Sequence, residues 1–447
     1  MNQDRKKIIE EEWQHIQESE TGSLKEKLER LIQSSMARDS ARTARAEARN
    51  ARQDDEEPRP HEEPLDLSQF DHGSPGECPL AIDSYHGRTR IGAGLELTGE
   101  ILALISRDDR FCGIDPSRIL YLDLETTGLS AGASNYAFLT GLGFFADDEF
   151  RIRQYFMRDF ADEPEILANV EDFLERFDAV VTFNGRAFDL PLLESRFVLG
   201  RRRTRLSGLP HLDMLYPARQ IWGERLESCS LRSLEENLLG VERHGDVPGA
   251  DIPQVYFEYL KTQNPYWISK VFHHNRLDIL SMMCVLTICH DLVARRSEAA
   301  IRDARDMLGL AFFYERRECY EQSSLYFSEA LGAGVGGESK IRAIKRASLM
   351  HRRAGKRQEA MLLWRDGAEE DGLAALEFMK NMAIHLERQE RRFTDAQAVV
   401  RDALERITRL SERHPHEPKL DRHRVDFEKR LERLVRRLAR QRDDPEN

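Results

Sequence analysis

The chain has 447 residues, 40% of them hydrophobic and 33% charged, and its formal net charge is −12. This length suits two or three domains, and no apolar run is long enough to cross a bilayer, so no membrane partner is expected. Nucleic acid normally meets a basic surface, so the acidic balance argues against tight, sequence-independent binding to it. The balance does not exclude catalysis on nucleic acid through a local basic patch and metal ions.

Charged residues dominate the N-terminal segment, residues 1–84, which begins without the apolar core of a signal peptide. The six cysteines of the chain form no Cys-x-x-Cys pair and no zinc-like spacing, so we expect a cytoplasmic protein with reduced thiols. One amphipathic stripe predicts a short helix with Leu24, Leu28, Leu31 and Ile32 on one side. Residues 37–64 carry almost no large apolar side chains, so we expect a solvated, disordered tail. Contact between its arginines and phosphates is the alternative.

Strand-like and helical patterns alternate in residues 85–299. Apolar runs bounded by turn residues predict strands at 118–127, 136–145, 149–158 and 179–185. Helical spacing and capping residues predict helices at 163–177, 187–200, 230–240 and 265–292. Three early strands followed by alternating helix and strand predict an α/β fold, in which helices flank a mixed sheet.

The sequence of residues 300–447 has no strand pattern and repeats a helix-pair pattern. Phe327, Trp364 and Val400 are 37 and 36 residues apart, close to the period of about 34 in tetratricopeptide repeats. The other positions of the pattern are Leu310, Tyr314, Ser323, Ala330, Ala360, Gly367, Ala396 and Ala403. We expect a few degenerate tetratricopeptide-like repeats, a form that mainly binds other proteins, followed by a basic C-terminal helix. An all-helical domain without repeat ancestry is the alternative.

Two carboxylates lie near the end of the strand predicted at 118–127. Side chains two residues apart in a strand point the same way, so Asp123 and Glu125 project together, opposite Leu122 and Leu124. Buried carboxylates this close are costly unless a cation lies between them, and a hard divalent metal with oxygen ligands is the obvious candidate. The sequence therefore predicts a metal site at this strand end.

Two further carboxylates stand among apolar residues. Asp189 follows the strand predicted at 179–185, and it is either a site residue or the cap of the helix that begins there. Asp278 lies inside the apolar helix predicted at 265–292, where a solvated face is a poor explanation for a charge. His274 precedes Asp278 by four residues, about 40° around the helix, so the two side chains share a face.

These parts together resemble the DEDD exonuclease branch of the ribonuclease H-like superfamily. That branch carries Asp-x-Glu on its first strand, Asn-x-x-x-Phe-Asp after a later strand, and a histidine or tyrosine before an aspartate on a late helix. The matching stretches here are "DLETTG", "NGRAFD" and "HHNRLD". Within that branch, roughly residues 100–293 are most similar to the YprB-type ribonuclease H-like domain.

The resemblance implies a metal-dependent nuclease that hydrolyses phosphodiester bonds of DNA or RNA, as a 3′–5′ exonuclease with two Mg²⁺ or Mn²⁺ ions. It implies that the metal ligands are Asp123, Glu125, Asp189 and Asp278. Two alternatives remain open. One is an inactive ribonuclease H-like binding module beside a tetratricopeptide scaffold, although the presence of all four carboxylates counts against it. The other is a structure-selective endonuclease.

The general base is expected to be a histidine, which accepts a proton close to neutral pH. DEDD exonucleases place a histidine five residues before the final aspartate or a tyrosine four before it. This chain has a histidine at both offsets from Asp278, namely His273 and His274. Helix geometry favours His274, because an offset of four rotates by about 40° and an offset of five by about 140°. An irregular first turn would favour His273.

Other polar residues near these motifs have two interpretations. His211 and Asp213 suit a position behind the site, and Arg219 suits contact with a phosphate. The alternative, which we favour for these residues, is a salt-bridged helix start. The densest basic run of this part, Arg201 to Arg205, suits contact with a nucleic acid backbone. No aromatic stacking ladder is evident in the sequence.

Overall fold

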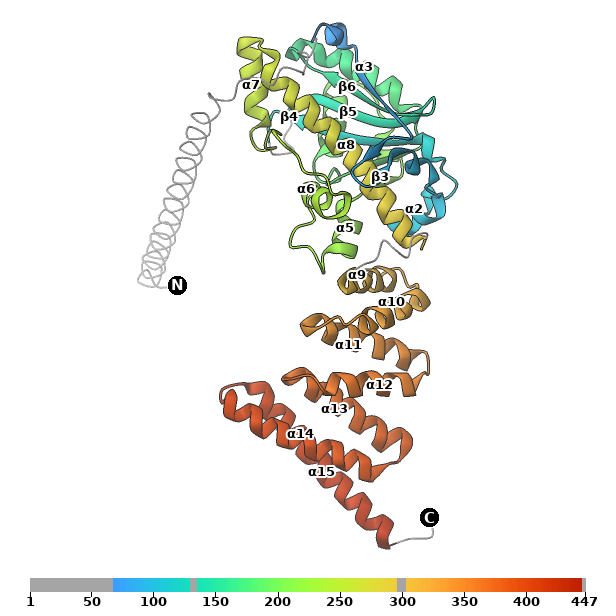
Figure 1. Cartoon of the computed structure of the whole chain (residues 1–447), viewed down its shortest axis with the longest axis vertical. Coiled ribbons are helices and arrows are strands. Elements are labelled where there is room, and N and C mark those ends of the chain that lie inside the picture. The colour runs from blue at the N-terminus through green and yellow to red at the C-terminus, as the bar shows by residue number, and fades with distance from the viewer. Residues whose placement is uncertain (1–66, 129–134, 296–302, 444–447) are drawn as a thin grey trace, which may run out of the picture. The chain divides into compact units, whose positions relative to one another are not determined.

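The computed structural model describes residues 67–128, 135–295 and 303–443. The helix predicted at Leu24 to Ile32 and the tail at 37–64 lie outside these ranges. Residues Leu65–Asn447 form one compact unit. Within that unit a mixed α/β part comes first, and an all-helical region follows α8 (Figure 1).

A six-stranded mixed sheet forms the centre of the α/β part, in the order β1-β6-β5-β4-β7-β8. Its strands are β1 (Gly76–Ala81), β4 (Ile119–Thr126), β5 (Ala137–Ala146), β6 (Glu149–Phe156), β7 (Ala179–Thr182) and β8 (His211–Asp213). β1, β6, β5 and β4 pair in antiparallel fashion, whereas β4, β7 and β8 pair in parallel. The four strands predicted from the sequence are confirmed as β4, β5, β6 and β7.

Two strands of this sheet gave no recognisable pattern in the sequence. β1 is an edge strand that contains Pro79, and β8 has only three residues. β1 pairs with β6 along its whole length, so the sheet begins earlier in the chain than the boundary at residue 85. A separate two-stranded hairpin consists of β2 (Tyr85–His86) and β3 (Thr89–Arg90).

Helices cover both faces of the sheet, and each face has its own apolar core (Figure 1). The helices are α2 (Gly99–Ser106), α3 (Glu163–Leu174), α4 (Asp189–Leu199), α5 (Leu215–Trp222), α6 (Leu231–Leu234), α7 (Ile252–Thr262) and α8 (Pro265–Val293). Tyr121 of β4 packs in the core shared with α2, α5 and most of α8. Leu122 packs in the core shared with α3, α4 and α7. Successive strand side chains thus serve opposite faces, as expected from a period of two.

Short helical turns complete this part. The 3₁₀ turns are η1 (Leu67–Gly73), η2 (Ile91–Glu96), η3 (Asp109–Phe111), η4 (Pro116–Arg118), η5 (Phe160–Asp162) and η6 (Leu206–Gly208). A π-helical turn, η7 (Glu235–Leu239), extends α6 and ends at Gly240, whose φ of 70° lies in the left-handed region that glycine tolerates.

The close packing of α8 on β5 depends on two strand glycines. A Cβ added at Gly141 would lie 2.1 Å from Asn275 Oδ1, and one at Gly143 would lie 2.4 Å from Ile279 Cγ2. A side chain at either position would therefore push the helix off the sheet. The absence of these side chains lets α8 lie directly over β4 and β5, which brings the polar face of the helix to the end of β4.

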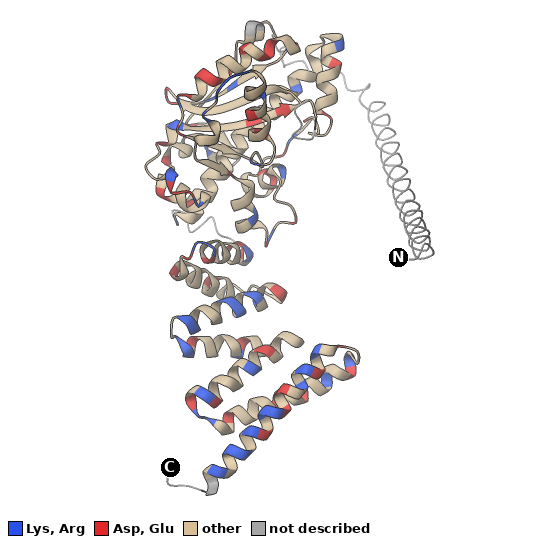
Figure 2. Cartoon of the chain, turned by 180° about the vertical axis from the view of Figure 1, so that it is seen from behind, with Lys and Arg blue, Asp and Glu red and all other residues tan. Residues whose placement is uncertain are grey.

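The described chain after α8 is entirely helical. Its helices are α9 (Ala304–Glu315), α10 (Tyr320–Gly332), α11 (Gly337–Arg353), α12 (Arg357–Ala368), α13 (Leu373–His385), α14 (Phe393–Arg413) and α15 (Pro418–Asp443), with a π-helical turn η9 (Leu386–Glu390) after α13. Each helix packs on the next one. Phe327, Trp364 and Val400 are buried between them, as the repeat pattern predicted. Basic and acidic residues recur along α14 and α15 (Figure 2).

The predicted fold class, a mixed sheet flanked by helices and then an all-helical region, is confirmed. The repeat ancestry and an independent domain boundary at residue 300 stay predictions. One apolar core runs from the α/β part into α9, α10 and α11. A Cβ at Gly309 of α9 would lie 1.9 Å from the Ile221 carbonyl oxygen of α5, so the two helices are in backbone contact there.

Candidate active site

The four carboxylates singled out in the sequence come from three elements that meet at the end of β4. Asp123 and Glu125 lie on β4, beside a register shift between Glu125 and Thr126. Asp189 is the first residue of α4, and Asp278 lies on α8. Irregularities of this kind re-aim side chains at the end of a strand and are frequent beside functional sites.

The electrostatics of the cluster show that its carboxylates are close together and short of positive charge. Burial raises the pKa of Asp123 well above its usual range, and the charges of Asp278 and Asp189 raise it further. Burial also raises the pKa of Glu125, and the charges of Asp123, Asp278, Asp189 and Asp246 add to the effect. Burial raises the pKa of Asp189 to about 7. Strong shifts from burial and like charge are typical of functional sites.

His274 faces this cluster from α8 and is held by a fifth carboxylate. Its Nδ1 lies 2.9 Å from both carboxylate oxygens of Asp246, in the loop before α7. Its Nε2 lies 3.5 Å from Asp278 Oδ2 and 4.0 Å from Glu125 Oε1. Burial alone would lower the pKa of His274, but the hydrogen bond to Asp246 and the charges of Asp278 and Asp246 raise it. The preceding residue, His273, is exposed.

A buried amide chain fixes the side chain of Asp123. Asn275 Nδ2 donates to Asp123 Oδ2 at 2.8 Å and to the Asp123 carbonyl oxygen at 3.2 Å. Gln154 Nε2 on β6 donates in turn to Asn275 Oδ1 at 2.8 Å and to the Phe272 carbonyl oxygen at 3.0 Å. Because both amides are buried, each donor and acceptor needs such a partner. The chain therefore locks one oxygen of Asp123 and leaves the carboxylate in a fixed orientation.

A buried arginine stands behind the cluster. The Arg243 side chain is 4% exposed, and its guanidinium pairs with Glu235, Asp246 and Asp278. Its Nε donates to Glu235 Oε2 at 2.7 Å, and its Nη1 donates to Asp246 Oδ2 at 3.1 Å. Burial lowers the pKa of Arg243, but these acidic partners outweigh burial and raise it. A planar, permanently charged guanidinium can thus hold the loop of Asp246 against both η7 and α8.

Asp213 braces the turn that leads to Asp189. Its carboxylate accepts from the backbone N–H groups of Asn184 at 2.7 Å, Arg186 at 3.1 Å and Leu215 at 3.1 Å. Asn184 has a φ of 66°, a left-handed conformation that this hydrogen bond helps to hold. His211 Nε2 instead lies 2.8 Å from Thr182 Oγ1. Among the described residues Asp213 forms no ion pair, so the predicted salt bridge is wrong, whereas its position at the start of α5 is confirmed by the hydrogen bond from the Leu215 N–H group.

The donor chemistry of the cluster fits divalent metal ions, whereas its present geometry is not that of a closed cage. Within the described ranges, no three His, Cys, Asp or Glu side chains are grouped so that they could hold an ion. The reason is visible in the contacts: Asp278 turns toward Arg243, and Asp123 turns toward Asn275. Carboxylate oxygens are nevertheless the ligands that Mg²⁺ and Mn²⁺ prefer, and burial, followed by neighbouring carboxylates, raises the pKa values of Asp123 and Glu125.

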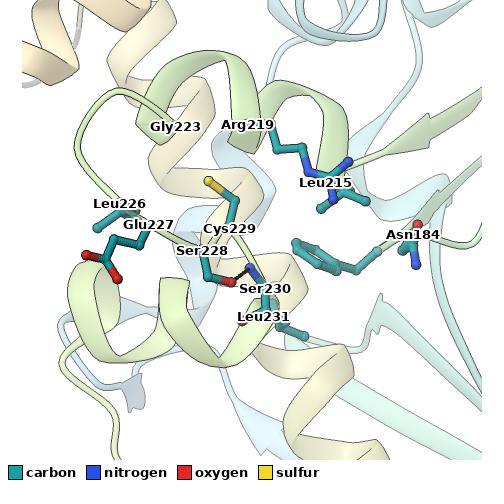
Figure 3. Close-up of a pocket in the computed structure, with 11 residues that line it drawn as sticks. Asn184, Leu215, Arg219, Gly223, Leu226, Glu227, Ser228, Cys229, Ser230 and Leu231 are labelled. Carbon is teal, nitrogen blue, oxygen red and sulfur yellow. Dashed lines mark hydrogen bonds between the residues drawn. The ribbon is translucent and has the colours of Figure 1, made fainter. Parts of the chain in front are cut away.

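A pocket of about 550 Å³ opens beside the turn at Asn184. Figure 3 shows Leu215 and Arg219 of α5 on one side and the segment from Leu226 to Leu231 on the other. Arg219, considered from the sequence as a phosphate contact, therefore lines a cavity next to the turn before Asp189. Of the basic run, Arg202 pairs with Glu171 at 2.5 Å and Arg205 with Glu175 at 3.3 Å, which reduces the positive charge it offers.

Three polar residues of the site were not found by sequence reasoning: Arg243, Asp246 and Gln154. Arg243 and Asp246 lie in the charged loop "VERHGDVPGAD", which has no periodicity and looks like any solvated connection. Gln154 lies between Arg153 and Tyr155 in β6, and its only signal is an amide on the strand face that also carries Ile152 and Phe156. Such residues become recognisable only when the fold brings their partners to them.

Within the described ranges, no helix combines the length and the apolar character that crossing a membrane requires.

Comparison with known proteins gives two findings. The chain is 27% identical over 305 residues to the "Uncharacterized protein YprB" of Bacillus subtilis (strain 168), a match that covers 67% of this chain and 72% of that protein. Residues 120–289, which include all four carboxylates, His274 and Arg243, match the model of the RNase_H superfamily. Residues 120–289 of this chain are therefore similar to ribonuclease H-like domains.

Proposed function

We propose that this protein is a metal-dependent nuclease that hydrolyses phosphodiester bonds of nucleic acid, most simply as a 3′–5′ exonuclease. One observation carries the proposal: His274 is held by Asp246 on one ring nitrogen and faces Glu125 and Asp278 with the other. A histidine oriented by a carboxylate and aimed at an acidic cluster is the arrangement expected of a general base. The match of residues 120–289 to the RNase_H superfamily supports the same class of reaction.

The residues proposed to hold the metal are Asp123, Glu125, Asp189 and Asp278. Two Mg²⁺ or Mn²⁺ ions, when bound there, would supply charge stabilisation to the phosphate and acidify water. The four side chains differ in how they are held. The amide of Asn275 fixes Asp123, backbone N–H groups approach Asp189, and the guanidinium of Arg243 contacts Asp278. Because Asp123 and Asp278 turn toward Asn275 and Arg243, these two carboxylates would have to reorient when a cation binds.

His274 is proposed to accept the proton of the attacking water. Because the Asp246 carboxylate can only accept at Nδ1, the proton of the neutral imidazole is assigned to Nδ1, and Nε2 carries the lone pair. Nε2 is also the nitrogen on the side of Glu125 and Asp278. Asp246 thus sets the tautomer and the ring orientation, as the aspartate of a hydrolase triad does.

The experiment is cleavage of end-labelled single- and double-stranded DNA and RNA by the purified full chain, with Mn²⁺, Mg²⁺ or EDTA. The proposal expects a ladder of products that starts from the 3′ end, appears with either metal and vanishes with EDTA. Internal cuts in any of these substrates, or cuts at a junction or flap in a branched DNA tested beside them, would favour the structure-selective endonuclease instead. No cleavage of any of these substrates would contradict the proposal.

A second candidate, a binding module without catalysis, is favoured by Arg243. Its guanidinium already neutralises Asp278, one of the four proposed ligands. A chain that relied on a metal at this carboxylate would have to share it with a buried arginine. Calorimetric titration with Mn²⁺ separates the two candidates, because only the nuclease requires the cluster to bind the ion.

The helical region from α9 to α15 is proposed to be tetratricopeptide-like and to bind a protein partner. The buried small and large residues at the repeat positions support this, because they allow consecutive helices to pack closely. We also propose a cytoplasmic location. Pull-down with the full chain and with a variant in exposed residues of α10 to α12 tests the partner, and fractionation tests the location.

A further inference from the structure

An exposed aromatic pair occupies the first turn of α8, the helix that also carries His274 and Asp278. Tyr266 is 48% exposed and Trp267 is 39% exposed. Their ring centroids are 5.1 Å apart in an edge-to-face arrangement. The Lys270 Nζ lies 4.6 Å from the centroid of Trp267 and 5.3 Å from that of Tyr266. Single exposed apolar residues are ordinary, but two adjoining rings with a cation form a defined surface.

Trp267 lies on the same face of α8 as the candidate active site, whereas Tyr266 is rotated by about 80° from His274. With 3.6 residues per turn, Trp267, His274 and Asp278 fall within about 40° of one another around the helix axis. The rise of 1.5 Å per residue places Trp267 roughly 10 Å before His274 and roughly 16 Å before Asp278 along that axis. The residues between them on the opposite face, such as Ile268 and Phe272, are buried in the core. Val271, between Trp267 and His274, is buried, so a strand that passes from Trp267 to the cluster would follow the side of Lys270, which lies about 40° from His274.

We propose that Tyr266, Trp267 and Lys270 form a stacking platform for single-stranded nucleic acid, a few nucleotides away from the bond that is cut. The proposal rests on the proposed nuclease function and names its substrate class. Aromatic rings stack on any base, and this sequence-tolerant contact requires bases that are not already stacked in a duplex. Lys270 supplies the charge complementarity. It forms no ion pair with any residue that the structure describes, so its ammonium is available to a phosphate.

The platform also explains how a chain with a negative net charge could bind nucleic acid. The net charge of −12 disfavours broad electrostatic attraction. Base stacking contributes affinity that does not depend on the overall charge of the protein. The sequence alone showed no stacking ladder, because one Tyr-Trp pair after an Asn-Pro step is unremarkable until the helix aligns Trp267 with His274 and Asp278.

The first test measures binding without cleavage, with the full chain in EDTA. Single-stranded oligo(dT) and oligo(U) of about ten nucleotides should quench the fluorescence of Trp267, the only exposed tryptophan among the described residues. A duplex of equal length should quench it much less. Trp267→Ala should weaken binding of labelled strands about 5- to 150-fold, measured by anisotropy. Trp267→Phe should restore most of the affinity. Tyr320→Ala, at an exposed aromatic residue of α10, is the matched control and should leave binding unchanged.

The second test separates this proposal from the nuclease proposal. With Mn²⁺, Trp267→Ala should raise the KM for long single strands with little change in kcat, because the platform contributes binding away from the reacting bond. Dinucleotides should not respond to the substitution. If the wild type cleaves single strands and Trp267→Ala leaves both affinity and KM unchanged, the platform is overturned and the nuclease stands. If strands bind through Trp267 but no metal supports cleavage, the platform stands and the nuclease falls. No binding of single strands by the wild type overturns the platform.

Discussion

Two buried glutamates, one in each region of the molecule, show how differently the two regions treat charge. Glu387 in the helical region accepts hydrogen bonds from Arg430 at 2.8 Å and from Arg433 at 2.7 and 2.9 Å. Burial alone would raise the pKa of Glu387, but these arginines outweigh burial and lower it. Among the described residues, Glu125 in the α/β part pairs with His274 alone, at 4.0 Å, and burial together with four aspartates raises the pKa of Glu125 well above its usual range.

The difference separates a structural carboxylate from a functional one. A buried ion pair whose hydrogen bonds are all satisfied holds helices together and needs no ligand from outside the chain. A cluster of buried carboxylates without matching cations costs folding free energy, and a fold keeps such a cluster where something outside the chain completes it. By this comparison, Glu387 is fully paired within the helical region, whereas the carboxylate cluster at the end of β4 requires a cation from outside the chain.

The largest effect is expected for the general base. His274→Ala should lower the cleavage rate by roughly 10²- to 10⁴-fold while Mn²⁺ binding is retained, because the four carboxylates are untouched. The matched control is His273→Ala at the exposed neighbour, which should change the rate little. Single-turnover assays on a labelled strand measure both. A larger loss for His273→Ala than for His274→Ala would contradict the assignment.

The two glutamates themselves should respond in opposite directions to the same substitution. Glu387→Gln should lower the free energy of unfolding by about 3 to 5 kcal/mol, because it leaves Arg430 and Arg433 without a buried counter-charge. Glu125→Gln should raise the free energy of unfolding without metal, on the order of 1 kcal/mol, because it removes an uncompensated charge. Urea unfolding in EDTA measures both variants. Destabilisation of equal size in the two would remove the distinction drawn here.

A glycine substitution tests whether the two regions fold as one unit. Gly309→Ala should destabilise the chain by about 1 to 3 kcal/mol, because its Cβ would lie 1.9 Å from the Ile221 carbonyl oxygen. Gly332→Ala, at the end of α10 with open space around it, is the control and should be neutral or slightly stabilising. Thermal unfolding followed by circular dichroism measures the shift. If Gly309→Ala lowers the melting temperature of the helical region alone, the two regions unfold separately.

A smaller effect is expected from pH. Burial, with the charge of Arg243 nearby, lowers the pKa of His86 to about 4, and its Nε2 lies 2.8 Å from Ser281 Oγ on α8. In the unfolded chain His86 therefore becomes protonated near pH 6.5, whereas in the folded chain it becomes protonated only near pH 4. Stability is full above the unfolded pKa and should fall by about 2 kcal/mol between pH 7 and pH 5. His86→Gln should reduce this slope, and His244→Gln, at an exposed histidine, should leave it unchanged.

Much of the fold could be predicted from the sequence because its signals are local. The apolar runs of β4 to β7 and the helical spacing of α8 depend on neighbouring residues alone. β1 was missed because half of an edge strand faces solvent, and β8 because three residues carry no period.

The site divides in the same way. Asp123, Glu125, Asp189 and Asp278 stand out as charges among apolar neighbours, so they could be singled out one by one. Arg243 and Asp246 could not, because their meaning comes from contact with Asp278 and His274, 35 and 28 residues away in the chain. The salt bridge predicted for Asp213 was wrong for a related reason. Its carboxylate accepts from backbone N–H groups, and a sequence does not show which backbone groups a side chain will contact.

The central claim is that the carboxylate cluster is completed by divalent metal ions, and calorimetric titration with Mn²⁺ tests it most directly. The wild-type chain should bind Mn²⁺, and Asp123→Asn should weaken that binding by at least about 10- to 100-fold while the fold is retained. Glu242→Gln, at an exposed acid one residue before Arg243, is the control and should bind as the wild type does. Equal Mn²⁺ affinity for the wild type and Asp123→Asn, or no binding by the wild type, would contradict the claim.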